Sequence, residues 1–262
     1  MSTEGAFYEP LGDGRYRATR ATIGPWSPGL QHAGPPCALL AHVLERLSPR
    51  PGSRIARLSV ELLGPVEVGE MAVTAAVERP GKRIQLLSAT AKVNGREAMR
   101  ALAWQLQAEP GRCPAAGPRE AAPPLPPPQP QAFFPGQPTF PYGEALEWRF
   151  TQGHFGEPGP ATVWTRCRIP IVAGEPLSGL CRLVAMVDSA NGISWELPLG
   201  GYTFVPVDLN VVLRRLPEGE WVGMSATTTI EGDGLGMVQT RLFDAGGAVG
   251  ASLHTLFVTP RG

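Results

Sequence analysis

Asp188 is the residue of this sequence whose spacing points most directly to chemistry. Leu180, Val184 and Asp188 follow one another at intervals of four residues, so a helix would place the carboxylate on the same face as the apolar side chains. Next to an apolar wall, a carboxyl group can have a raised pKa and can act as a general base toward water. An acidic residue near a helix end that only hydrogen-bonds a turn would look the same in the sequence.

A second candidate is the loop that precedes the helix-like stretch GPPCALLAHVLERL. Backbone N–H groups at a helix start can polarise a carbonyl oxygen, so this loop could form a pocket wall or an oxyanion site. Its candidate substrate-binding residues are His32, Ala33 and Gly34. A plain helix start explains the same residues, because glycine and proline are favourable there without any ligand.

Two other groups of residues are weaker candidates. Arg83 lies beside the turn at Pro80 and Gly81 and could contact a phosphate group of a ligand, although basic residues at hairpin tips are usually only solvated. The four cysteines form no Cys-x-x-Cys pair and have no metal-ligand spacing with the four histidines. We therefore predict no metal site and interpret the thiols as reduced and mostly packed, as in a cytosolic protein.

The composition argues against several classes of protein. The 262 residues carry 23 basic and 23 acidic side chains. The basic ones are scattered singly, so nucleic acid is not an expected partner. The start of the chain lacks an apolar signal core, and the uncharged run 246 to 260 is too short to cross a bilayer. We expect a cytoplasmic protein that does not enter a membrane.

The elements that would position these residues come in two copies. The stretch that opens at Gly34 precedes strand-like residues 58 to 106, and a similar stretch near Gly179 precedes strand-like residues 207 to 258. The offset of about 150 residues is long enough for each copy to be a small domain. The chain is therefore predicted to be a fused pseudo-dimer of the α+β class.

Within each copy, the hydrophobic pattern predicts one helix and a meander of strands. A first strand is expected at 16 to 22, and Pro35 suits the first turn of the helix that follows it. Asn94–Gly95 is the strongest hairpin signal. The second helix is predicted over 177 to 189, with Asn191–Gly192 as its stop. A long curved antiparallel sheet wrapped around a central helix satisfies the pattern of each copy.

Residues 108 to 141 differ from both copies. They hold twelve of the 29 prolines and almost no β-branched residues. They are therefore predicted to form a polyproline-like connector between an N-terminal domain, 1 to 107, and a C-terminal domain, 142 to 262. A docking site for a proline-binding partner is the alternative. Because the edge strands of each domain need partners, a homodimer or larger homo-oligomer is also predicted.

Longer stretches of the sequence resemble a known family. They are HAGPPCALL after a tryptophan, GEMAVTAAVERPGKRIQLLSATAKVNGREAMRALAWQL in the first half, and FVPVDLNVVLRRLPEGEWVGMSATTTIEGDGLGMVQTRLFDAGGAVGASLHTLFVTP in the second. They look like the acyl-CoA thioesterase II family over nearly the whole chain except the proline-rich linker. The resemblance implies a double hotdog fold of two tandem hotdog repeats. It also implies hydrolysis of a fatty acyl-CoA substrate to free acid and CoA, without a metal or organic cofactor.

The same resemblance implies a catalytic set in which an Asp, a Thr and a Gln orient the attacking water. The Asp matches Asp188. The Thr position falls on Pro206 or its neighbour, which leaves Thr203 and Asp208 as the nearest polar side chains. The Gln position falls on His254, which could be a substituted catalytic partner or a packed strand residue.

These substitutions leave three functions open. The first is a thioesterase in which Asp188 activates water and His254 is a substituted partner. The second is an acyl or acyl-CoA binding protein that kept the fold and lost the chemistry. The third is an acyl-CoA hydratase on the same fold, which would use Asp188 and His254 as an acid–base pair.

Overall fold

The computed structural model describes residues 5–136 and 139–261, which form two halves. The first half contains β1 (Tyr8–Gly12), β2 (Arg15–Ala18), the 3-10 helix η1 (Arg20–Thr22), α1 (Gly34–Leu47), β3 (Ser53–Leu62), β4 (Glu70–Arg79), β5 (Ile84–Val93) and β6 (Arg96–Gln107). The second half contains α2 (Pro141–Ala145), β7 (Leu146–Gln152), β8 (Ala161–Cys167), α3 (Gly179–Val187), α4 (Ala190–Ile193), β9 (Tyr202–Pro206), β10 (Asp208–Leu213), β11 (Val222–Ile230), β12 (Leu235–Asp244) and β13 (Gly247–Pro260).

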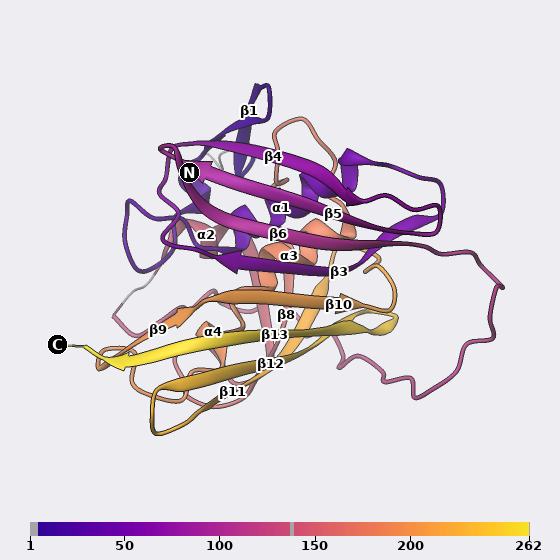
Figure 1. Ribbon diagram of the computed structural model, residues 1–262. Coiled ribbons are helices and arrows are strands. Elements are labelled where there is room, and N and C mark those ends of the chain that lie inside the picture. Colours follow the sequence, from indigo (N-terminus) through magenta and orange to yellow (C-terminus); the bar gives the residue numbers. More distant parts are fainter. Residues whose placement is uncertain (1–4, 137–138, 262) are drawn as a thin grey trace.

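The predicted repeat is confirmed by the order of the strands. All thirteen strands belong to one antiparallel sheet (Figure 1), in which the first half contributes β1-β2-β4-β5-β6-β3 and the second contributes β7-β8-β11-β12-β13-β10. The remaining strand, β9, lies off this path and pairs with β13. The two series match strand for strand, and α1 and α3 each follow the second strand of their half. The halves meet where β3 pairs with β10, with Val60 opposite Leu209. The repeats therefore share one continuous sheet.

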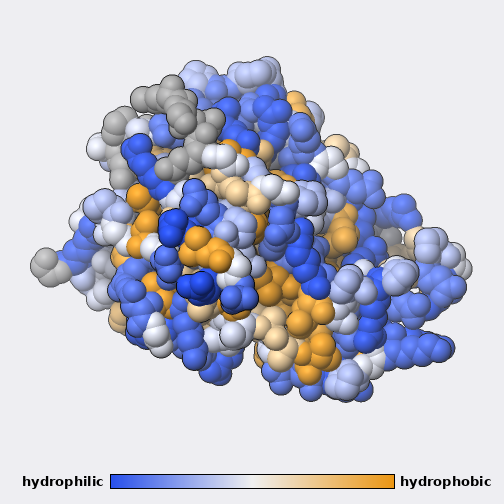
Figure 2. Space-filling view, turned by 90° about the horizontal axis from the view of Figure 1, so that it is seen from above, coloured by the Kyte–Doolittle hydropathy of each residue, from blue (hydrophilic) through white to orange (hydrophobic). Residues whose placement is uncertain are grey.

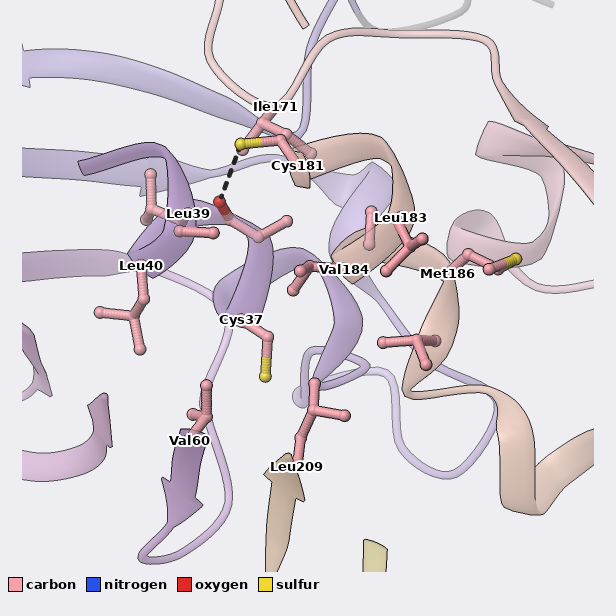
Figure 3. Close-up of a cluster of buried hydrophobic side chains, with 14 of the residues drawn as sticks. Cys37, Leu39, Leu40, Val60, Ile171, Cys181, Leu183, Val184, Met186 and Leu209 are labelled. Atoms are coloured by element: carbon pink, nitrogen blue, oxygen red, sulfur yellow. Dashed lines mark hydrogen bonds between the residues drawn. The ribbon is translucent and has the colours of Figure 1, made fainter. Parts of the chain in front are cut away.

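The two central helices pack against each other and against the sheet. Both helices bury an apolar face, as the periodicity predicts. Figure 3 shows Val184 of α3 lying between the two helices, with Val60 and Leu209 of the sheet below. The Cys181 Sγ donates a weak hydrogen bond to the Ala38 carbonyl, at 3.6 Å. The core of the molecule therefore lies where the two repeats meet. The ends of both helices lie there as well.

Some local predictions are confirmed and others are corrected. Asn94 and Gly95 connect β5 to β6 with φ angles of 50° and 77°, as a two-residue hairpin loop requires. The strand expected at 16 to 22 is instead the end of β2 followed by η1. Asn191–Gly192 lies within α4, because the preceding helix already ends at Val187. The sequence prediction missed β1, α2, α4 and β9, which are too short to show a clear period.

The proline-rich linker closes one edge of the sheet. Gln129 exchanges two hydrogen bonds with the backbone of Phe150 in β7, both 2.8 Å long. Gln131 does the same with Trp148, at 3.0 and 2.9 Å. In the described residues of the linker, 108–136 and 139–140, the backbone itself adds no strand. Its two side-chain amides instead take the place of peptide groups at an edge that would otherwise be open to another chain.

Replacing both Gln129 and Gln131 with alanine is expected to lower the free energy of unfolding by about 1–3 kcal/mol, because water only partly replaces the lost hydrogen bonds. The uncovered β7 edge should also promote self-association. Urea unfolding and light scattering measure the two effects, with Gln152→Ala as a control because that side chain is exposed on the same strand. A double variant as stable and as monodisperse as the control would show that the linker does not protect the edge.

At the other end of the sheet, the first strand is tied to the second half. Phe7 N and Tyr8 N donate to the carbonyls of Pro170 and Ile171, at 3.0 and 2.9 Å. Both outer strands thus make contacts within the chain. The face shown in Figure 2 is largely hydrophilic, with hydrophobic patches between the hydrophilic regions. The homo-oligomer stays a prediction, and a light-scattering mass equal to one chain would contradict it. Within the described ranges, no helix is long and apolar enough to span a membrane.

Candidate functional site

A mainly apolar cavity of about 470 Å³ lies between the two halves. Its walls come from the loop before α1, the segment after β3, the end of the linker, the α3–α4 junction and β9. Aromatic side chains form a large part of it, namely Trp26, Phe134, Phe140, Phe155 and Phe204. The polar lining side chains are Gln31, His32, Asp188, Ser189, Asn191, Thr203 and Arg261. Such a cavity suits an apolar ligand group with polar chemistry at one end.

Asp188 and His32 meet in this cavity, one from each half of the chain. Asp188 is the C-cap residue that follows α3, and only 4% of its surface is exposed. Its Oδ2 lies 3.0 Å from Nδ1 of His32. Its Oδ1 is buried and has no hydrogen-bond partner among the described residues. Oδ2 is therefore held in place, while Oδ1 can still accept a hydrogen bond.

Burial sets the charge of this pair. Desolvation raises the pKa of Asp188 to about 7, although the nearby backbone N–H groups of Gly34 and Ala33 favour the charged carboxylate. Desolvation also lowers the pKa of His32 to about 3. The imidazole is therefore neutral at physiological pH, and its 3.0 Å contact with Asp188 is not an ion pair. A carboxyl group with a pKa near 7 can change protonation state in that pH range.

Gly34 allows the start of α1 to approach the end of α3. Its N–H donates to Nδ1 of His32 at 3.1 Å. A Cβ atom at this position would lie 2.3 Å from the Ala185 carbonyl oxygen, far inside van der Waals contact. Pro35 and Pro36 carry no N–H, so the helix start offers few donors, and those of Ala33 and Gly34 lie near Asp188. The glycine is needed here for close packing as well as for the start of the helix.

Gly34→Ala is expected to lower the free energy of unfolding by at least about 2 kcal/mol, because α1 must move away from the Ala185 carbonyl. The same movement would separate His32 from Asp188. Thermal unfolding measures the loss of stability, with Gly232→Ala as the control because a Cβ atom there meets nothing within 4 Å. Equal melting temperatures for the two variants would contradict the close approach of the helices.

The structure brings together five of the seven candidate residues from the sequence. Asp188, His32, Ala33 and Thr203 line the cavity, and Gly34 contacts His32. Pro206, at the position expected for a threonine, also lines it. The end of α3 that carries Asp188, the loop before α1, and β9 therefore meet at the cavity.

The other two candidates lie elsewhere. Arg83 lies in the turn between β4 and β5, near Gln107 at the end of β6 that is remote from the cavity. His254 is 1% exposed on β13, beside Val238, and does not line the cavity. Burial lowers the pKa of His254 to about 4, and neither ring nitrogen has a hydrogen-bond partner among the described residues. This position fits a packed strand residue better than a substituted catalytic partner.

Sequence reasoning missed Tyr142 and the aromatic wall. The Tyr142 ring stacks on the imidazole of His32, with centroids 3.9 Å apart. Phe134 and Phe140 come from the end of the linker, which was predicted to be only a connector. One signal in the sequence could have indicated this wall. Aromatic residues follow the proline run, in the stretch FFPGQPTFPY. Over the described part of the chain, no three His, Cys, Asp or Glu side chains group as a metal ion would require.

Solved structures with the same fold include thioesterases from several bacteria. The acyl-CoA thioesterase II TesB2 from Mycobacterium marinum is 16% identical, with a TM-score of 0.68 over 97% of this chain and 95% of that one. A putative thioesterase from Novosphingobium aromaticivorans is 19% identical, with a TM-score of 0.71 over 96% and 98%. A hot dog fold protein of unknown function from Alicyclobacillus acidocaldarius is 16% identical, with a TM-score of 0.73 over 97% and 95%. The predicted double hotdog fold is thereby confirmed.

Family models match both halves of the sequence. The model of the acyl-CoA thioesterase N-terminal domain matches residues 22–106, and that of the C-terminal domain matches residues 114–258. No curated protein matches the chain significantly. The two matches agree with the repeated sheet and with a cavity that draws residues from both halves. The chain therefore belongs to the acyl-CoA thioesterase family.

Proposed function

We propose that this protein hydrolyses fatty acyl-CoA thioesters to free acid and CoA, with Asp188 as the general base. The observation that carries the proposal is the buried carboxyl group of Asp188, with Oδ2 against His32 and Oδ1 without a partner, in an apolar cavity. A base of raised pKa suits the removal of a proton from water near neutral pH. The apolar lining suits a hydrocarbon acyl chain.

The proposed reaction uses one water molecule. Its oxygen attacks the thioester carbonyl carbon while one of its protons passes to Oδ1 of Asp188. The tetrahedral intermediate then collapses, the carbon–sulfur bond breaks, and the proton on Asp188 passes to the departing CoA sulfur. When Asp188 is protonated, Nδ1 of His32 can accept a hydrogen bond from Oδ2, as it does from the Gly34 N–H. When Asp188 is a carboxylate, the ring must carry its proton on Nδ1 to donate to Oδ2, and the bond from Gly34 is then given up.

The test is to incubate the purified protein with acyl-CoAs of several chain lengths and to follow release of the free thiol. Turnover that disappears in Asp188→Asn would support the proposal. Binding of acyl-CoA without turnover by the wild-type protein would favour an acyl-CoA binding protein instead. Calorimetry with a non-hydrolysable acyl-CoA ether separates failure to bind from failure to react.

A hydratase has less support than a thioesterase. It would need Asp188 and His254 to act together on the acyl chain, yet only Asp188 lines the cavity. Incubation with an enoyl-CoA tests this function directly, because hydration removes the absorbance of the conjugated double bond. Hydration that depends on Asp188, without release of thiol, would replace the thioesterase proposal.

A further inference from the structure

Tyr142 occupies a central position beside the candidate site. It belongs to α2, the short helix that follows the proline-rich linker, and it is fully buried. Its N–H donates to the Ile23 carbonyl at 3.0 Å, which ties α2 to the segment before α1. Burial raises the pKa of its phenol well above the usual value, so the hydroxyl stays protonated.

Tyr142 contacts both sides of the Asp188–His32 pair. Its ring lies over the imidazole of His32 with an angle of 11° between the two planes. Its hydroxyl donates to the Ala185 carbonyl at 2.7 Å and lies 2.9 Å from Ser189 Oγ. Ala185 is in the last turn of α3, and Ser189 follows Asp188 directly. The tyrosine therefore holds the imidazole through its face and the end of α3 through its hydroxyl.

From these contacts we propose that Tyr142 is a positioning residue that sets the distance and orientation between Asp188 and His32. This inference rests on the proposed function. The two partners come from different halves of the chain, and the 3.0 Å contact between them depends on how those halves pack. Because Tyr142 stacks on His32 and hydrogen-bonds the end of α3, it limits the motion of His32 relative to Asp188. In a general-base reaction, a displacement of about 1 Å can reduce the rate by about 10²-fold.

The same ring limits access of water to the pair. Tyr142 covers one face of the imidazole and also packs near Phe140 and Trp148. Removing its hydroxyl or its ring would loosen the end of α3 and let water approach the carboxyl group of Asp188. The pH at which that carboxyl group titrates should then fall toward its ordinary range.

The test compares Tyr142→Phe, which keeps the ring, with Tyr142→Leu, which removes the stacking. We expect kcat to fall about tenfold in the first and about 10²-fold in the second, with KM little changed. The midpoint of the pH profile of kcat/KM should move to lower pH in both. Tyr16→Phe is the control, because Tyr16 lies in β2 and does not line the cavity. Wild-type kcat and an unchanged midpoint in Tyr142→Phe would overturn the inference.

A spectroscopic measurement separates this inference from the proposed function. In ¹⁵N-histidine NMR spectra, the Nδ1 signal of His32, assigned with His32→Asn, reports the hydrogen bond to Asp188. The signal should change in Tyr142→Phe and should keep its wild-type position in Tyr16→Phe. If the wild-type protein hydrolyses no acyl-CoA, the proposed function fails, and this signal alone decides whether Tyr142 positions the pair. An unchanged signal in both Tyr142 variants would then overturn the inference.

Discussion

Replacing Asp188 with asparagine is expected to lower kcat/KM for acyl-CoA hydrolysis by a factor of about 10²–10⁴, the usual contribution of a general base. Asparagine keeps the size of the side chain but cannot accept a proton from water. The measurement is thiol release under conditions in which circular dichroism shows an unchanged fold. Asp233→Asn is the control, because this acidic residue lies in the turn between β11 and β12.

The wild-type pH profile belongs to the same prediction. Because the pKa of Asp188 is raised to about 7, kcat/KM should be low in acid, rise through about pH 7 and level off above it. The carboxylate is the active form, so activity should increase as the proton leaves. A midpoint near the ordinary Asp value of 3.8, or an Asp188→Asn variant that keeps wild-type activity, would show that another group is the base.

Asp188→Asn is also expected to stabilise the fold, and more so at high pH. The native carboxyl group keeps its proton up to about pH 7, whereas in the unfolded chain it loses the proton near pH 3.8. Between these values the native state binds more protons, so this group makes the wild-type free energy of unfolding fall as pH rises. A difference of about three pKa units corresponds to about 4 kcal/mol. The uncharged asparagine does not have this dependence.

Urea unfolding of both proteins at pH 4 and pH 8 measures the effect. From pH 4 to pH 8, the free energy of unfolding of the variant should rise by up to about 4 kcal/mol relative to that of the wild type. Most of this change should occur between pH 4 and pH 7. Asp233→Asn again serves as the control for general effects of removing a carboxylate. A stability difference that does not change with pH would mean that Asp188 is not buried as the structure places it.

These two predictions share one physical cause. Burying a carboxyl group against apolar walls costs stability and makes the group a better base. A variant that is inactive but more stable at pH 8 is typical of a site selected for chemistry rather than for packing. Loss of both activity and stability would instead indicate a structural role for Asp188.

The sequence alone determined most of the repeated fold. Alternating burial in strands and the apolar face of each helix are properties of neighbouring residues, so the pattern revealed α1, α3 and the main strands. Asn94 and Gly95 predicted their hairpin because few other residues adopt positive φ angles. Short elements such as β9 and α4 were missed, because their burial depends on contacts with distant parts of the chain.

The sequence also determined which helix end carries a buried carboxyl group, since Leu180, Val184 and Asp188 share a face. Only the tertiary structure decided that the partner of Asp188 is His32, that Tyr142 contacts His32 and the end of α3, and that His254 lies outside the cavity. Periodicity describes one element at a time and holds no information on how two repeats dock. Their relative placement follows from the pairing of β3 with β10 and the packing of α1 on α3, which join residues far apart in the chain.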